Sequence, residues 1–204
     1  MKRSDGTGDE QLFFDLVGPQ FIEDWSSDGR LIAYRNETRE TGDDFWVLPL
    51  TGDRKPRALM RTRYEEWGPR FSPDSSWVAF TSNETGRNEV YVAPVQGPGA
   101  RRQVSTEGGG SPRWRRDGKE LFYLSGDGRS LMSAPVTLTP SVPRSGTPQR
   151  LFTIDRQKAT PGNPRNLAYD VTPDGQRFLF VVTAGDQAPP QISVVANWTA
   201  LLTP

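Results

Sequence analysis

Short apolar stretches alternate with turn residues along this chain, and one ten-residue pattern occurs four times. Each copy begins with an aromatic or apolar residue, passes through an aspartate-containing turn and ends in a short apolar strand. The copies occupy residues 25–34, 71–80, 114–123 and 171–180. Their turn aspartates are Asp28, Asp74, Asp117 and Asp174. Proline before the aspartate and glycine after it suit a type I turn, so each copy predicts two strands joined by that turn.

Two more apolar stretches follow the copies at a similar spacing. A third strand is predicted at residues 46–50, 91–95, 132–136 and 192–196, and a short exit strand at 57–59, 102–104 and 149–152. Pro49, Pro94 and Pro135 recur in the third strand. Since proline cannot donate a hydrogen bond to a neighbouring strand, we expect each of them at the end of its strand. A complete unit is therefore expected to contain four short strands.

Repeated four-stranded units of this length predict an all-β protein with the architecture of a β-propeller. The turn aspartates are 46, 43 and 57 residues apart. We expect residues 1–204 to form one region, with a leading segment 1–20 and blades at 21–66, 67–109, 110–168 and 169–204.

About four blades are enough for the smallest closed ring, but we favour an arc of a larger, six- to eight-bladed propeller. The stretch 11–17 predicts a strand that belongs to a missing blade or completes the fourth. An arc would leave apolar blade faces exposed, so it also predicts self-association.

The four copies resemble the WD40-like repeat known as PD40, found in TolB-like propellers, through residues 25–29, 71–74, 114–118 and 172–175. A closer similarity is to the C-terminal propeller of bacterial multidomain serine/threonine protein kinases, and it is carried by residues 44–50, 82–92, 118–123 and 197–199. These resemblances imply a non-catalytic interaction or sensor module with a protein or peptide partner. They favour the periplasmic or cell-envelope side and leave a cytoplasmic location open. The alternative is the gating propeller of a prolyl-oligopeptidase-type serine peptidase.

The composition excludes most common catalytic chemistry. The chain has no cysteine and no histidine, which removes thiol nucleophiles, disulfides, the usual zinc ligands and imidazole acid–base catalysis. A kinase glycine-rich loop followed by Val-Ala-Ile-Lys is missing from the sequence. We therefore predict that this chain is not an enzyme and has no catalytic residue, cofactor or metal site. With 25 basic and 25 acidic residues and no run of about 20 apolar residues, we expect neither nucleic-acid binding nor membrane insertion.

One polar position recurs next to the first residue of each copy. It is occupied by Asp24, Arg70, Arg113 and Asp170. The first strand of a propeller blade is the innermost one, so these side chains are candidates for a polar ring at the mouth of the central channel. The alternative is that they form structural ion pairs between neighbouring blades, because buried charges are usually paired.

The tryptophans and other large residues divide into two sets. Trp25, Phe71, Trp114 and Val171 share one repeat position, and we expect them to wedge between blades as part of the core. Trp46, Trp67 and Trp77 fall outside that position. For these three, packing inside the blades is the main expectation and an exposed binding surface is the alternative.

Overall fold

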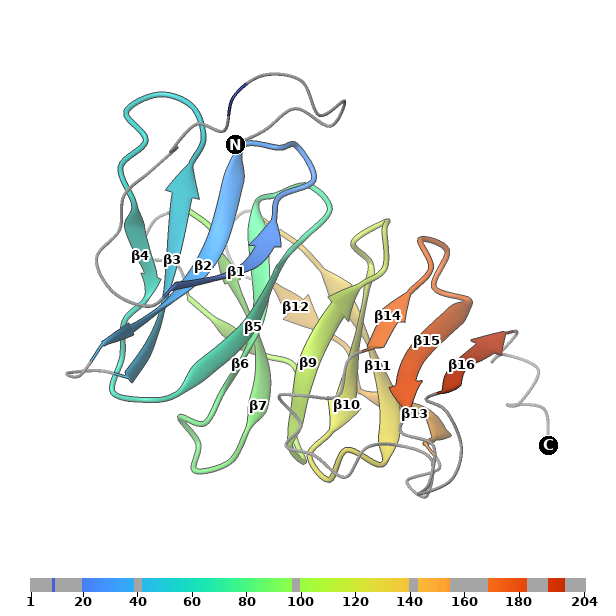
Figure 1. Ribbon diagram of the computed structural model, residues 1–204. Coiled ribbons are helices and arrows are strands. Elements are labelled where there is room, and N and C mark those ends of the chain that lie inside the picture. The colour runs from blue at the N-terminus through green and yellow to red at the C-terminus, as the bar shows by residue number, and fades with distance from the viewer. Residues whose placement is uncertain are drawn as a thin grey trace.

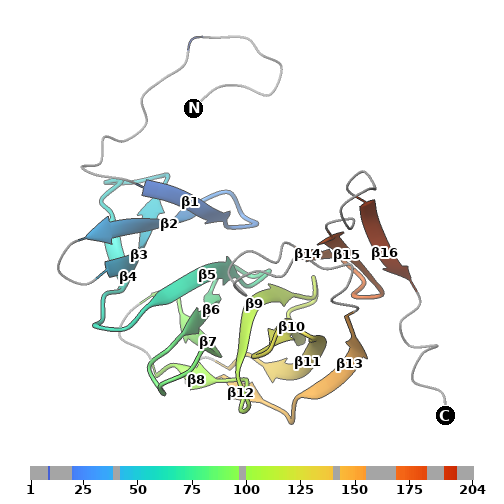
Figure 2. The same cartoon turned by 60° about the horizontal axis from the view of Figure 1, so that its bottom comes forward.

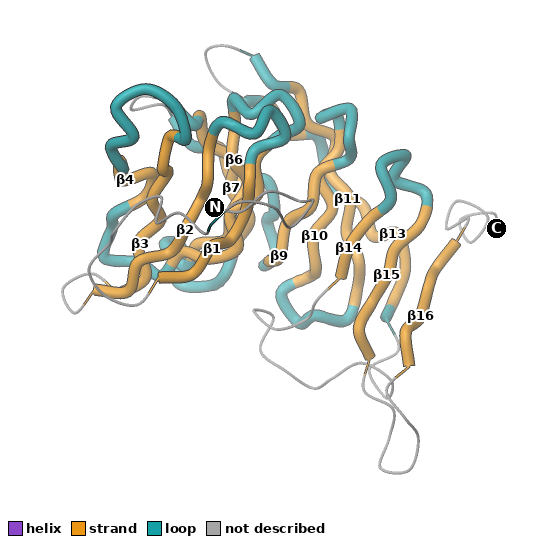
Figure 3. The backbone as a smooth tube through the Cα atoms, turned by 45° about the horizontal axis from the view of Figure 1, so that its top comes forward, coloured by secondary structure: helices purple, strands orange, loops and turns teal. Residues whose placement is uncertain are grey.

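A computed structural model of the chain describes residues 9, 20–38, 42–96, 100–139, 143–154, 169–182 and 191–196. Within these residues all regular structure is β-strand, as Figure 3 shows. The strands form four antiparallel sheets that follow one another along the chain (Figure 1), and we refer to them as blades 1 to 4. The all-β prediction is confirmed. The strand predicted at 11–17 and the kinase-like segment 197–199 lie outside the described residues.

The strands lie in chain order across each blade, except that the last strand of blade 3 pairs with the third strand of that blade. Blade 1 consists of β1 (Gln20–Trp25), β2 (Leu31–Thr38), β3 (Gly42–Pro49) and β4 (Arg57–Met60). Blade 2 consists of β5 (Glu66–Phe71), β6 (Trp77–Ser82), β7 (Glu89–Pro94) and β8 (Arg102–Gln103). Blade 3 consists of β9 (Gly109–Trp114), β10 (Glu120–Ser125), β11 (Ser130–Thr137), β12 (Arg144–Ser145) and β13 (Gln149–Thr153). The described part of blade 4 consists of β14 (Tyr169–Val171), β15 (Arg177–Val182) and β16 (Gln191–Ala196).

The blades stand around a common centre, and blades 1 and 4 are the two ends of the arc (Figure 2). The first strands β1, β5, β9 and β14 face that centre, as expected for a propeller. Strand β1 contacts β5, and β5 contacts β9. The predicted exit strands of the first three units are confirmed as β4, β8 and β13.

The aspartate turn is built in the same way in all four blades. A side-chain oxygen of each aspartate accepts the backbone amide two residues later, at 3.0, 3.1, 3.0 and 3.0 Å for Asp28, Asp74, Asp117 and Asp174. In blade 1 the Ser26 hydroxyl also donates to the carboxylate, at 2.6 Å. In blade 3 the Arg115 guanidinium takes over this role, with Nε 2.9 Å from the carboxylate oxygen. These bonds close the turn between the first two strands, so the aspartates serve the fold.

The turn bonds predict a loss of stability in acid. The Arg115 guanidinium lowers the pKa of Asp117 from 3.8 to about 2. Hydroxyl donors lower the pKa values of Asp28 and Asp174. Because the folded chain favours the ionised carboxylates, their contribution is complete above the unfolded pKa and is lost as the pH falls through the folded pKa. We expect the urea midpoint of unfolding to fall between about pH 4 and about pH 2.

The matched variant for this prediction is Asp117→Asn, which keeps a side-chain oxygen for the turn but does not titrate. Its urea midpoint should depend less on pH in the same window than that of the unchanged chain. An unchanged pH dependence in this variant would contradict the role of the Arg115 contact.

The prediction for the third-strand prolines is confirmed in two blades and wrong in the third. Pro49 and Pro94 end β3 and β7, whereas β11 continues past Pro135 to Thr137. Strand β13 pairs with β11 up to Ser133, and β12 pairs with it from Val136 onward. Pro135 lies in the gap between the two partner strands, where no neighbouring strand requires its missing amide hydrogen.

The cores lie between neighbouring blades, and three of the four predicted wedge residues contribute to them. Phe71 and Trp114 pack into the clusters shared with the preceding blade, and Val171 packs against the cluster between blades 3 and 4. The prediction is wrong for Trp25, which is 52% exposed, whereas Phe71 is 7% exposed. A wedge needs a preceding blade, and the described residues place none before blade 1.

Candidate functional site

The predicted polar residues all lie on the strands that face the centre of the arc. Asp24 is on β1, Arg70 on β5, Arg113 on β9 and Asp170 on β14. The first three are half-buried and Asp170 is exposed. Their charges act on one another: the pKa of Arg70 is lowered by burial and then by Arg113, while Asp24 and Asp170 oppose the shift. The structure therefore brings all four into one electrostatic neighbourhood.

The direct contacts between blades 1, 2 and 3 at this position run from side chains to backbone. Asp24 Oδ2 accepts the amide of Phe71 at 2.7 Å, and the Arg70 guanidinium donates to the carbonyl of Glu23. Trp114 Nε1 donates to the carbonyl of Arg70 at 3.0 Å. Burial raises the pKa of Asp24 in spite of these favourable contacts. The side chains thus join the blades, but through backbone groups in place of the ion pairs considered from the sequence.

The seam between blades 3 and 4 is fastened by an aromatic contact. The Arg113 guanidinium lies 5.3 Å from the ring centre of Tyr169. The hydroxyl of Tyr169 donates to the carbonyl of Ser111 at 2.9 Å, and burial raises the pKa of this phenol. Asp170 Oδ1 accepts the amide of Val171 at 2.9 Å. These contacts give Arg113 a structural partner and leave Asp170 at the exposed end of the series.

A groove of about 750 Å³ opens beside blade 3, and the sequence did not predict it. Three segments distant in sequence form it: the loop into β9, the turn between β10 and β11, and the segment before and into β13. Exposed charges line it at Glu107, Asp127 and Arg150, and the half-buried Met132 contributes thioether surface. Tyr123 also borders the groove but is only 2% exposed. We refer to this as the blade 3 groove.

Two glycines hold the loops of the groove against each other. A Cβ added at Gly126 would lie 3.0 Å from the Cα of Gly108 and 3.2 Å from the carbonyl oxygen of Glu107. Gly108 also has a φ of +88°, which favours glycine. The loop into β9 and the β10–β11 turn therefore touch through their backbones, which fixes the width of this part of the groove.

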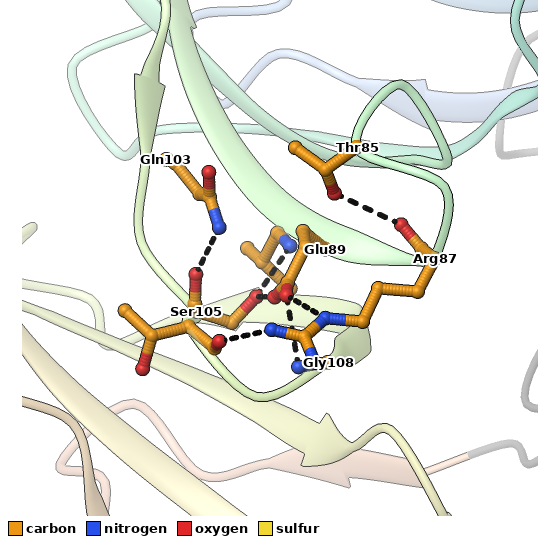
Figure 4. Close-up of polar contacts among 8 residues, drawn as sticks. Thr85, Arg87, Glu89, Gln103, Ser105 and Gly108 are labelled. Carbon is orange, nitrogen blue, oxygen red and sulfur yellow. Dashed lines mark hydrogen bonds and ion pairs between the residues drawn. The ribbon is translucent and has the colours of Figure 1, made fainter.

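A buried carboxylate anchors the same loop through its backbone, as Figure 4 shows. Glu89 is fully buried at the start of β7. Its Oε1 accepts the Arg87 Nε at 2.7 Å and the Gly108 amide at 3.0 Å, while its Oε2 accepts the Ser105 hydroxyl. The Ser105 hydroxyl in turn accepts the amide of Val90 at 2.7 Å. We refer to Glu89 and these partners as the Glu89 network, and it ties the groove loop to the core of blade 2.

The tryptophans outside the wedge position serve packing. Trp67 and Trp77 are both buried, and Trp46 packs against the cluster of blade 1, so an exposed tryptophan surface is the wrong alternative. Trp67 reaches into blade 3: a Cβ added at Gly110 would lie 2.6 Å from its ring. Gly110, the second residue of β9, thus makes room for an aromatic ring from the neighbouring blade.

Comparisons with known proteins agree with this architecture. No protein-family model matches the chain. Over 110 residues, 52% of this chain, it is 35% identical to tricorn protease homolog 1 of Streptomyces coelicolor and covers 10% of that protein. The crystal structure of TolB from Acinetobacter baumannii matches with a TM-score of 0.60 at 15% identity, over 85% of this chain and 39% of TolB.

The fold is that of a TolB-like β-propeller. The β-propeller domain of the trilobed protease from Pyrococcus furiosus also matches this chain. The TM-score is 0.51 at 15% identity, and the match covers 86% of this chain and 53% of that domain. The chain spans only a tenth of the tricorn homolog and about two fifths of TolB, so these likenesses concern the propeller alone.

Metal-binding clusters and membrane-spanning helices were also sought among the described residues. Among the described residues, no group of three or more acidic side chains is placed to hold a metal ion. The same residues include no helix that is long and apolar enough to cross a membrane.

Proposed function

We propose that this chain is a non-catalytic TolB-like propeller module that binds a protein or peptide partner in the blade 3 groove. The groove carries the proposal, since its volume of about 750 Å³ is in the range of ligand sites and its loops are held by backbone contact and by the Glu89 network. The absence of histidine and cysteine from the sequence supports binding over acid–base or nucleophilic catalysis.

The lining of the groove suits a segment of polypeptide. Glu107 and Arg150 offer opposite charges, and the half-buried Met132 offers thioether surface for one apolar side chain. The mixture of signs favours a partner with alternating charged and apolar residues over a uniformly charged polymer. Methionine contacts of this kind are enriched at protein interfaces.

Binding can be tested with a charge-swapped groove. Peptides are selected from a displayed random library against the unchanged chain, and their affinities are measured by fluorescence anisotropy. The variant Glu107→Lys with Arg150→Glu keeps the net charge and is expected to weaken the selected peptides by about tenfold or more. The matched control is Asp53→Lys with Lys55→Glu on an exposed loop of blade 1, which should bind as the unchanged chain does. Peptides that bind the groove variant and the control equally would refute the groove as the site.

We further propose association with a bacterial serine/threonine kinase on the envelope side of the cell. The similarity of residues 44–50 and 82–92 to the propellers of such kinases supports this association. Sequencing the DNA on both sides of the coding region tests it. Kinase motifs joined in frame to a stretch of about 20 apolar residues are expected.

A second candidate is the propeller of a protease. It is favoured by the 35% identity to the tricorn protease homolog over 110 residues. The alternative considered from the sequence, the gating propeller of a prolyl-oligopeptidase-type serine peptidase, is also a propeller that belongs to a protease. A hydrolase domain encoded in frame beside this chain would favour this candidate over the kinase association.

A further inference from the structure

The strongly exposed large apolar side chains of the described residues are confined to the two end blades. On β1 they are Phe21, Ile22 and Trp25, at 47, 76 and 52% exposure, and on β15 they are Leu179 and Val181, at 40 and 52%. Ile22 and Trp25 pair with Tyr34 and Ile32 of β2 and share their face of blade 1, and we refer to these two residues as the head strip. Phe21 pairs with Arg35 and lies on the other face. Within the described parts of blades 2 and 3, the equivalent surfaces are covered by the neighbouring blade.

The exposed positions at the two ends are the two sides of one repeating seam. Trp25 occupies the repeat position of Trp114, which packs against the preceding blade in a cluster that includes Ala79. Leu179 occupies the repeat position of Ala79. Every internal seam of this kind therefore joins a residue at the position of Trp25 to a blade face at the position of Leu179.

The end of blade 4 also has a shallow hollow where a wedge residue would sit. The hollow has a volume of about 420 Å³ and is lined mainly by apolar surface around Asp170, Arg177 and Leu179. These are the repeat positions of Arg70, Trp77 and Ala79 in blade 2. There, Trp77 and Ala79 pack with Trp114, and the Arg70 carbonyl accepts its indole hydrogen at 3.0 Å. We refer to it as the tail hollow.

The head of the arc is open along its inner strand. Tyr34, Leu48 and Leu50, further out on the same face of blade 1, are buried, and Ile32 is half-buried. A partner at this end would therefore meet the head strip of β1 first. The head strip includes the indole ring of Trp25.

We propose that the tail hollow receives Trp25 from a second copy of this chain, so that copies join head to tail through a seam like the internal ones. In this seam, Trp25 Nε1 donates to the Asp170 carbonyl of the other copy, as Trp114 Nε1 donates to the Arg70 carbonyl within one copy. Such a contact is heterologous. Two copies that close on each other make an eight-bladed ring, within the range of about four to eight blades, and without closure the copies continue as a chain.

Sedimentation velocity over a series of protein concentrations tests the proposal on the 204-residue chain. The unchanged chain should shift from the mass of one copy to that of two or more. Trp25→Glu and Leu179→Glu should each weaken this association by about tenfold or more, because each spoils every seam. Ile22→Glu repeats the test at the most exposed position of the head strip, should Trp25→Glu perturb folding. Thr137→Glu, at an exposed position of β11 in blade 3, is the control and should associate as the unchanged chain does.

Mixing the two end variants distinguishes a head-to-tail seam from a symmetric one. A pair made of one Trp25→Glu copy and one Leu179→Glu copy retains one unchanged seam, so the mixture should associate more strongly than either variant alone. A chain that stays monomeric at all concentrations, or that associates equally well with Leu179→Glu, would overturn the proposal. The groove variant with Glu107→Lys and Arg150→Glu should still associate, so failure of this proposal is distinguishable from failure of the proposed function.

Discussion

Phe71→Ala is expected to destabilise the chain by about 3–5 kcal/mol, whereas Trp25→Ala should change its stability by less than about 1 kcal/mol. The two residues occupy the same repeat position. Phe71 is 7% exposed and packs between blades 1 and 2, so its loss leaves a cavity in that core. Trp25 is 52% exposed, so its removal takes less apolar surface out of contact.

Urea unfolding followed by far-UV circular dichroism measures both changes. The protein is kept dilute enough to remain monomeric, because Trp25 is also placed in the proposed seam between copies. Each variant serves as the control for the other, since both remove an aromatic side chain from the first strand of a blade. Equal losses at the two positions would show that blade 1 is covered by another blade and is not the end of an arc.

Glu89→Ala is expected to destabilise the chain by about 3 kcal/mol. The substitution removes the acceptor of the Gly108 amide and the Ser105 hydroxyl in a buried place, and unmet buried donors are costly. It also releases the guanidinium of Arg87 from a contact of 2.7 Å. The loop that borders the blade 3 groove then loses its anchor to blade 2.

Glu89→Gln is the matched control, because it keeps an acceptor oxygen and the side-chain shape but removes the charge. We expect it to lose about half as much stability as Glu89→Ala, since hydrogen bonds to charged groups are the stronger ones. Denaturant unfolding gives the stabilities, and hydrogen exchange of the Gly108 amide reports on the loop itself. Fast exchange at Gly108 is expected in the alanine variant. Protection equal to that of the unchanged chain would contradict the anchoring role of Glu89.

Much of the fold can be predicted from the sequence because the same residue pattern recurs in register in all four units. Each turn aspartate is placed correctly, since the hydrogen bond from its side chain to an amide two residues later is a local interaction. The exit strands also follow from spacing alone. Pro135 departs from its repeat because two separate strands, β12 and β13, share one neighbour and leave a gap where proline fits. No local sequence pattern predicts that two strands will pair with different parts of β11.

The sequence by itself determined the residue types at each repeat position, the four turns and the alternation of strands, because these depend on neighbours only a few residues apart. Only the tertiary structure decided that Trp25 is exposed while Phe71 is buried, since burial depends on whether another blade packs in front. The same holds for the polar position, where Asp24 and Arg70 contact backbone groups of the adjacent blade. The blade 3 groove was hidden from the sequence as well, because it exists only where three distant segments meet around Gly108 and Gly126.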